Sequence, residues 1–124
     1  MEPTKKKILI IEDEKPMAHA LQLKLAHEGF EAKSVFNGEE GLAILKSETF
    51  DIILLDLVMP KVDGFKVLGM LKEHNIKTPV MILTNLSQEE DEKRARDLGA
   101  VEFFIKSNTP IAQIVGIVKE KLNV

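Results

Sequence analysis

Four short apolar runs in this sequence are each followed directly by side chains that can handle phosphate or a metal ion. These side chains are Glu12 with Asp13, then Asp56, Thr84 and Lys106. Carboxylates brought together repel one another, and one takes up a proton unless a cation neutralises them. Oxygen ligands favour a hard cation, and Mg²⁺ suits best because it keeps several waters and uses few carboxylates. A magnesium site is therefore predicted wherever the fold brings these residues together.

A phosphoryl group is the other reactant that suits this set of side chains. An aspartate beside such a metal can attack phosphorus and form an acyl phosphate. The hydroxyl of Thr84 could donate to one phosphoryl oxygen, and the ammonium of Lys106 could contact another. Both contacts gain strength only when the dianionic group arrives, so the same residues could also work as a switch.

The elements that must position these residues are strands alternating with helices. Residues 52–55 are apolar throughout, as in a strand covered on both faces at the centre of a parallel sheet. Residues 32–35 alternate polar and apolar side chains, which favours a place at the sheet edge. The other three strands are predicted over 8–11, 80–83 with Thr84 closing the run, and 101–105.

Capping residues and glycines mark the helices between the strands. A first helix with Pro16 near its first turn is expected to stop at Gly29, and a fourth is expected to end before Gly99. Three helix starts carry a capping signal: Asn37 with Glu40, Ser87 with Glu90, and Thr109 with Pro110 as cap and first helical residue. The predicted inward positions are Leu42 and Leu45 in the second helix, Val67, Leu68 and Leu71 in the third, and Ile111, Ile114, Val115, Val118 and Leu122 in the fifth.

Strand and helix alternate five times without a repeat or linker, which predicts one α/β domain over residues 1–124. Right-handed crossovers make it a doubly wound parallel sheet, and the flavodoxin-like strand order 2-1-3-4-5 is the best fit. In that order the first and third strands are neighbours, with the fourth and fifth alongside. Their carboxyl ends, and the reactive side chains after them, would open on one crevice.

The composition excludes several classes of protein. The formal charge of −3 gives no reason to expect nucleic-acid binding by this domain, and the lack of cysteine excludes disulfide and thiol chemistry. No apolar segment approaches the roughly 20 residues of a membrane span, and the amino terminus lacks a signal-peptide pattern. We therefore expect a cytoplasmic protein that does not engage the membrane.

Four motifs together resemble the receiver domain of two-component response regulators, from about Lys7 to Leu122. They read Ile-Ile-Glu-Asp-Glu (10–14), Leu-Leu-Asp-Leu-Val-Met-Pro-Lys-Val-Asp-Gly (54–64), Ile-Leu-Thr-Asn (82–85) and Gly-Ala-Val-Glu-Phe-Phe-Ile-Lys (99–106). At these spacings the set is highly specific, and it implies a signalling domain rather than an enzyme. Beyond the resemblance, Val58 and Leu86 are expected to flank the path of a hydrolytic water that neither can orient by hydrogen bonding, so self-dephosphorylation should be slow.

The resemblance implies a role for each motif residue. Asp56 would be the phosphoacceptor, Thr84 the switch hydroxyl and Lys106 the phosphate-binding lysine. Glu12, Asp13, Asp56 and the backbone carbonyl of Val58 would hold Mg²⁺, and Phe103 would reorient with Thr84. The phosphoryl donor would be a phosphohistidine on a sensor histidine kinase or a phosphotransfer protein.

Three positions depart from what is usual in that family. Ser107 stands where a proline often follows the lysine, so the bond before it can be trans and the loop more mobile. Asn85 replaces a small residue after the switch threonine, where it would crowd access to the phosphoryl group. Phe103 has no hydroxyl where tyrosine is frequent, so turning inward would lose no hydrogen bond to water.

The region around the fourth and fifth helices is the expected interaction surface. The fourth helix is mostly charged, with Ala95 and Leu98 as its few apolar anchors, and is well placed to shift when the site fills. The fifth helix carries Ile117 beside its inward stripe. We expect the face made by the fourth helix, fifth strand and fifth helix to bind a partner or a second copy of the chain. Ordinary core packing with one exposed isoleucine is the alternative.

The sequence fits three alternative functions less well than it fits a receiver domain. A phosphohydrolase of the haloacid dehalogenase type needs a general acid two residues after the aspartate, where Val58 stands. A receiver-like module that binds partners without phosphorylation would not need the intact reactive set. A flavin carrier needs hydroxyls and glycines in the loop after Ile11, which is acidic here.

Overall fold

The computed structural model describes residues 5–59, 62–86 and 88–124. Its strands are β1 (Lys7–Ile11), β2 (Glu31–Val35), β3 (Ile52–Leu55), β4 (Val80–Thr84) and β5 (Glu102–Ile105). Its helices are α1 (Lys15–His27), α2 (Gly38–Ser47), α3 (Gly64–Glu73), α4 (Glu89–Asp97), the short 3₁₀ helix η1 (Lys106–Asn108) and α5 (Ile111–Leu122).

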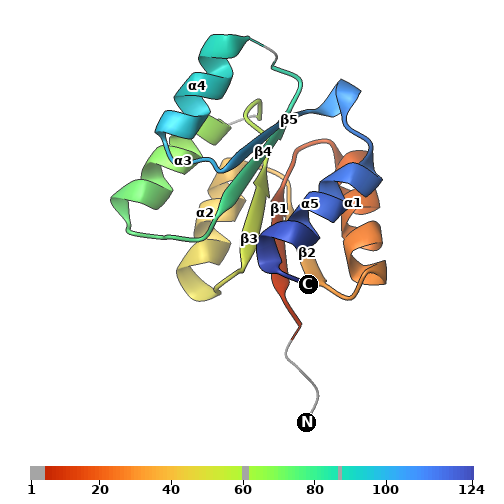
Figure 1. Cartoon of the computed structure of the whole chain (residues 1–124). Helices are drawn as coiled ribbons and strands as arrows, with labels where there is room; N and C mark the ends of the chain where they lie inside the picture. Colours follow the sequence, from red (N-terminus) through yellow and green to blue (C-terminus); the bar gives the residue numbers. More distant parts are fainter. Residues whose placement is uncertain (1–4, 60–61, 87) are drawn as a thin grey trace.

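The five strands form one parallel sheet in the order β2-β1-β3-β4-β5, which confirms the predicted topology. Helices α1 and α5 cover one face, and α2, α3 and α4 cover the other (Figure 1). Both β2 and β5 lie at sheet edges, as predicted for the strand over 32–35.

Two apolar layers sandwich the sheet and explain the unbroken apolar runs. Alternate residues of a strand point to opposite faces, so Leu9 packs on the α2–α3–α4 side while Ile8 packs on the α1–α5 side. Every residue of β3 and β4 is buried. The strands that carry the reactive side chains are therefore held rigidly on both faces.

Most predicted helix boundaries agree with the structure. Gly29 and Gly99 follow their helices with φ of +96° and +111°, a conformation that glycine adopts without steric cost. The Glu40 N–H donates to Asn37 Oδ1 at 2.9 Å, while the Glu40 carboxylate accepts from Phe36 N–H rather than from the cap residue itself. Ser87, predicted to cap the fourth helix, lies outside the described residues.

The segment between β5 and α5 differs from the prediction. Residues 106–108 form a 3₁₀ helix, and α5 begins at Ile111 with Pro110 as its N-cap. Thr109 does not cap α5, because its hydroxyl donates to the Ile105 carbonyl at 3.0 Å and closes the 3₁₀ turn. All peptide bonds of the described residues are trans, the one between Lys106 and Ser107 included. Ile117 is half-buried against the α1–α5 layer, so it is not the exposed isoleucine that the alternative assumed.

No helix in the described ranges has the length and apolar character that crossing a membrane requires.

Candidate functional site

The reactive residues predicted at the strand ends lie together at the carboxyl end of the sheet. Ile11 is paired with Leu55 across β1 and β3, so Glu12 and Asp56 leave their strands side by side. The pairing continues one step further, because Asp56 N–H donates to the Ile11 carbonyl at 2.9 Å. Thr84 is paired with Ile105, the residue before Lys106. Strand register therefore sets the positions of all four chain segments.

Three carboxylates meet at this end of the sheet. One oxygen each from Glu12, Asp13 and Asp56 lies within 4.8 Å of the others. Glu12 and Asp56 are only 2% and 4% exposed, whereas Asp13 is half-buried. Backbone donors fix the two buried groups: Glu14 N–H donates to Glu12 Oε2 at 3.0 Å, and Val58 N–H donates to Asp56 Oδ1 at 3.2 Å. The cluster is thus a built site rather than an accident of surface charge.

The ammonium of Lys106 crosses from β5 and η1 to this acidic cluster. Its Nζ lies 2.6 Å from Glu12 Oε1 and 3.2 Å from Asp56 Oδ2, and the lysine side chain is 8% exposed. Nζ also lies 3.5 Å from Oε2 of Glu14, a more exposed side chain. Sequence reasoning missed Glu14, although the third acid of the run 12–14 is the signal that could have found it.

Burial dominates the electrostatics of the cluster. It raises the pKa of Glu12 from 4.5 to about 7, although Lys106 and the Glu14 N–H partly oppose the shift. Burial also raises the pKa of Asp56, against the lowering effect of Lys106 and the Val58 N–H. For Lys106, burial lowers the pKa, but the nearby carboxylates of Glu12 and Asp56 outweigh this effect and raise the pKa overall. More negative charge is present than one ammonium can offset.

The donor set fits a divalent cation. When ionised, three carboxylates and one ammonium sum to a charge of −2, the charge that a dication neutralises. Glu12 Oε1 is buried without a partner in hydrogen-bond geometry, although the Lys106 ammonium is close. A buried carboxylate oxygen left in this state is a ready ligand for a hard cation.

The other predicted site residues are Thr84, Val58 and Phe103. Thr84 is fully buried, and its hydroxyl oxygen accepts from Leu86 N–H at 3.3 Å, which leaves its proton for another acceptor. The Val58 side chain is 55% exposed beside Asp56. Phe103 is half-buried and packs against the layer on the α2–α3–α4 side.

A glycine that carries no chemistry fixes the backbone next to Asp56. A Cβ on Gly64 would lie 2.4 Å from the Asp56 carbonyl oxygen and 2.6 Å from Leu57 Cα. The Gly64 N–H donates to the Leu57 carbonyl at 2.9 Å, and Asp63 caps α3 by accepting from Lys66 N–H. The start of α3 is therefore pressed directly onto the chain that carries Asp56.

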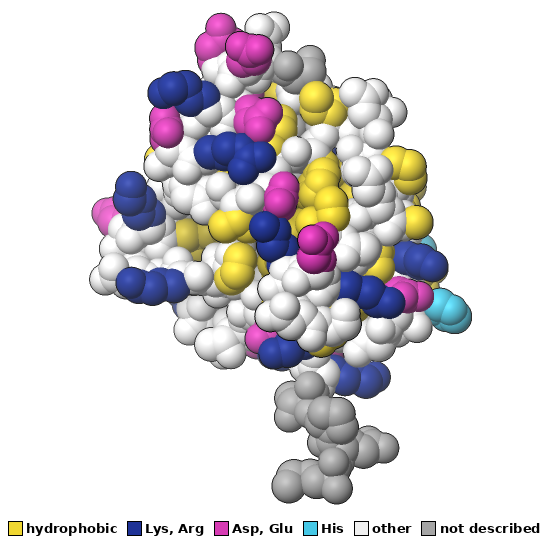
Figure 2. Space-filling model, in the orientation of Figure 1, with side chains coloured by type: hydrophobic (Ala, Val, Ile, Leu, Met, Phe, Trp, Pro, Cys, Tyr) yellow, Lys and Arg dark blue, Asp and Glu magenta, His cyan; other side chains and the backbone are white. Residues whose placement is uncertain are grey.

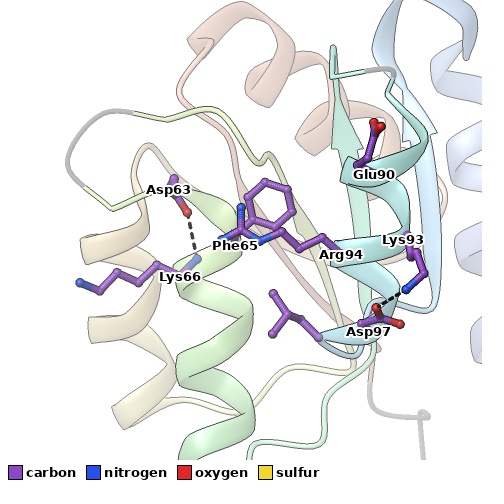
Figure 3. Close-up of a pocket in the computed structure, with 8 residues that line it drawn as sticks. Asp63, Phe65, Lys66, Glu90, Lys93, Arg94 and Asp97 are labelled. Carbon is purple, nitrogen blue, oxygen red and sulfur yellow. Dashed lines mark hydrogen bonds and ion pairs between the residues drawn. The ribbon is translucent and has the colours of Figure 1, made fainter.

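The same helix contacts α4 through one aromatic side chain. The guanidinium of Arg94 lies 4.0 Å from the centroid of the Phe65 ring, and Figure 3 shows it reaching across from α4 to α3. Phe65 is buried, and Ala95 is the only buried residue of α4. Helix α4 is thus held against α3 by a small contact. Phe65, the aromatic residue of this contact, directly follows Gly64 in the chain.

The chain belongs to the family of response regulator receiver domains. The family model for the response regulator receiver domain matches residues 8–118.

Individual relatives agree with this assignment. The chain is 37% identical over 100 residues to the transcriptional regulatory protein DltR of Streptococcus agalactiae, a match that covers 81% of this chain and 45% of DltR. It is 36% identical over 116 residues to the cell cycle response regulator CtrA of Brucella ovis, with 91% of this chain and 50% of CtrA covered. The chain spans about half the length of these curated relatives.

Solved structures agree as well. The receiver domain of the Francisella response regulator 1452 matches with a TM-score of 0.90 at 28% identity, covering 96% of this chain and 98% of that one. The phosphorylated cyanobacterial phytochrome response regulator RcpA matches with a TM-score of 0.81 at 32% identity, covering 94% and 91%.

Proposed function

We propose that residues 1–124 form a single receiver domain that accepts a phosphoryl group on Asp56 from a phosphohistidine of a sensor histidine kinase or phosphotransfer protein. The observation that carries this proposal is the position of the Asp56 carboxylate. It is buried, held by the Val58 N–H on one oxygen and by Lys106 on the other, and within 4.8 Å of two further carboxylates. A carboxylate oriented in this way is suited to act as a nucleophile.

The transfer is a displacement at phosphorus. A carboxylate oxygen of Asp56 forms the new O–P bond while the N–P bond of the phosphohistidine breaks. The electron pair of that bond returns to the imidazole nitrogen, which takes up a proton. Lys106, 3.2 Å from Asp56, would offset charge on the phosphoryl oxygens in the transition state.

We propose Mg²⁺ as the cation, held by Glu12, Asp13, Asp56 and the carbonyl of Val58. Bound there, it would neutralise carboxylates and phosphoryl oxygens that otherwise repel one another. Glu12 must be ionised to bind it, and Glu14 N–H keeps that carboxylate in place. Lys106 would then be released from Glu12 toward the phosphoryl group.

Phosphorylation would act as a switch through Thr84 and Lys106. The Thr84 hydroxyl proton and the Lys106 ammonium each have reason to move toward a new dianion. Such a move of Thr84 would free space that Phe103, half-buried on the neighbouring strand, can enter. The weak anchoring of α4 by Ala95 and the Arg94–Phe65 contact would let this helix follow.

The output surface is proposed to be the face formed by α4, β5 and α5. This face is turned to the viewer in Figure 2, where apolar atoms lie in the hollow between charged side chains. Strand β5 contributes the half-exposed side chains of Phe103 and Ile105, and Val101 before it is exposed. A partner protein or a second copy of the chain, meeting in the cytoplasm, would cover these groups.

The domain is proposed to lose its phosphoryl group slowly and not to work as a phosphohydrolase. Val58 and Leu86 flank the expected path of a hydrolytic water, and neither side chain can orient it by hydrogen bonding. Loss of the label within seconds of phosphorylation at neutral pH would refute the slow reaction.

Intact-protein mass spectrometry after incubation with acetyl phosphate and Mg²⁺ tests the proposal. The expected result is the addition of one phosphoryl group that is absent from an Asp56→Asn variant and abolished by a chelator. The exposed Asp97→Asn variant, which alters a carboxylate on α4, is the matched control and should be labelled normally. Labelling of Asp56→Asn to the same extent would overturn the assignment.

A further inference from the structure

A long groove between α2 and α3 takes no part in the site described above. Its volume is about 620 Å³, and its apolar lining includes Leu42, Leu45, Val62, Met70 and Ile76. These side chains are half-buried, so they close the outer edge of the core but remain open to solvent. Apolar lining in an open groove on a signalling domain indicates a place where another apolar surface can pack.

The groove runs the full length of both helices. On α2 it is lined by residues from Glu39 to Lys46, and on α3 from Lys66 to His74 just past its end. A Cβ on Gly38 would lie 2.5 Å from the Val62 carbonyl, which places the starts of the two helices side by side. Each helix has 10 residues and is therefore about 15 Å long, enough for nearly three turns of a third helix.

Positive charge lies at both ends of this apolar lining. Lys66 is in the first turn of α3, Lys46 is in the last turn of α2, and both are exposed. In the described part of the chain neither makes an ion pair, whereas Lys93 and Arg96 of α4 are paired with Asp97 and Glu92. Figure 3 shows Lys66 extending away from Arg94, to the side of α3 opposite α4. Glu39 is the one acid of the lining.

We propose that this groove binds an amphipathic helix of a partner protein, with an apolar stripe flanked by acidic residues about seven positions apart. The stripe would pack on the aliphatic lining, and the acids would meet Lys66 at one end and Lys46 at the other. Seven residues of helix span about 10 Å, the same rise that separates the first and last turns of α2. The groove uses different elements from the α4–β5–α5 face, so both surfaces can be occupied together.

A synthetic helical peptide of 16 residues with this pattern, titrated into ¹⁵N-labelled protein, tests the proposal. Amide shifts should change along α2, α3 and residues 74–76, and the affinity should fall about tenfold in the Lys46→Glu, Lys66→Glu double variant. A peptide with lysines in place of its acids should bind the Lys46→Glu, Lys66→Glu double variant more tightly than it binds the unaltered domain. Because both lysines are exposed, the variant is expected to fold, which circular dichroism would check.

Three results would overturn the proposal. One is equal binding of the acidic and basic peptides to the unaltered domain. Another is a set of shifts confined to α4, β5 and α5. The third is a set of shifts in α2 and α3 that depends on protein concentration without peptide, since the occupant would then be a second copy of the chain. The Lys93→Glu variant, which makes one such substitution on α4, serves as the control and should bind the acidic peptide as the unaltered domain does.

Discussion

Glu12 and Lys106 form a nearly buried ion pair, with 2.6 Å between Oε1 and Nζ, although 94 positions separate them in the chain. The pair joins the first strand to the loop after the last one across the carboxylate of Asp56. In the absence of a cation, the Lys106 ammonium supplies the positive charge that reduces the repulsion between the carboxylates of this site.

Removing this ammonium should destabilise the metal-free domain. For Lys106→Ala we expect the free energy of unfolding to fall by on the order of 2 kcal/mol. This is less than the cost of leaving a buried charge unpaired, because Glu12 can take up a proton. Mg²⁺ should recover part of the loss, since it replaces the missing positive charge. Urea unfolding with and without Mg²⁺ measures both effects. Lys119→Ala, which removes a surface pair with Glu28, is the control and should show no Mg²⁺ dependence. An equal loss in both conditions would contradict this account.

The stability of the metal-free domain should fall as pH rises from about 4.5 to about 7. The pKa of Glu12 is raised from 4.5 to about 7, so in this range the folded state binds more protons than the unfolded state. The slope of the unfolding free energy against pH is then negative, and the raised pKa of Asp56 has the same sign. The total change should be on the order of 1–3 kcal/mol.

Urea unfolding in a chelator at pH 5, 6 and 7 measures this slope. Glu12→Gln should flatten most of it, leaving the contribution of Asp56. Mg²⁺ competes with the proton on Glu12, so its affinity should rise over the same pH range. A domain that becomes more stable between pH 5 and 7 in the chelator would show that the carboxylates are not strained by burial.

Two glycines of the same helix should respond in opposite directions to alanine. A Cβ on Gly64 would meet backbone atoms of Asp56 and Leu57 at 2.4 and 2.6 Å, so Gly64→Ala should cost about 2 kcal/mol or more and slow phosphorylation. Gly69, also in α3, has nothing within 4 Å of the added carbon, and Gly69→Ala should stabilise by about 0.5–1 kcal/mol. Urea midpoints compare the two. Similar values for both variants would mean that the start of α3 is not pressed onto the Asp56 backbone.

Loss of the Arg94 contact should loosen α4. In Arg94→Ala, a cation–π contact of about 0.5–1 kcal/mol at an exposed site is removed, so the amides of α4 should exchange about twofold to fivefold faster. Hydrogen exchange read by mass spectrometry measures this. Arg94→Lys should restore part of the protection. Lys93→Ala, which removes a surface ion pair with exposed Asp97, should leave α4 nearly unchanged. Equal exchange rates in the two alanine variants would contradict the claim that the contact between Arg94 and Phe65 holds α4 in place.

The sheet and the placing of its reactive side chains were predictable because burial on both faces leaves a strong pattern. Residues 52–55 and 80–83 have no polar position, and each run is followed directly by a polar residue, Asp56 or Thr84. The parallel order then requires those ends to meet. The roles of these residues in phosphorylation stay predictions.

The features that escaped prediction depend on distances between segments far apart in the chain. Gly64 resembles an ordinary turn glycine until its approach to the Asp56 carbonyl is known. Arg94 and Phe65 lie on different helices, so no local pattern pairs them. The 3₁₀ turn at Lys106 escaped because Thr109 followed by Pro110 is also a common helix start, and the structure uses the Thr109 hydroxyl for Ile105 instead.

The central claim is that Asp56 is the nucleophile of this site. Borohydride reduction of the phosphorylated domain converts an aspartyl phosphate to homoserine, and peptide mapping by mass spectrometry then locates that residue. The account predicts homoserine at position 56 and at no other carboxylate. Homoserine at position 12 or 13, or its absence from a domain that carries the phosphoryl mass, would contradict it.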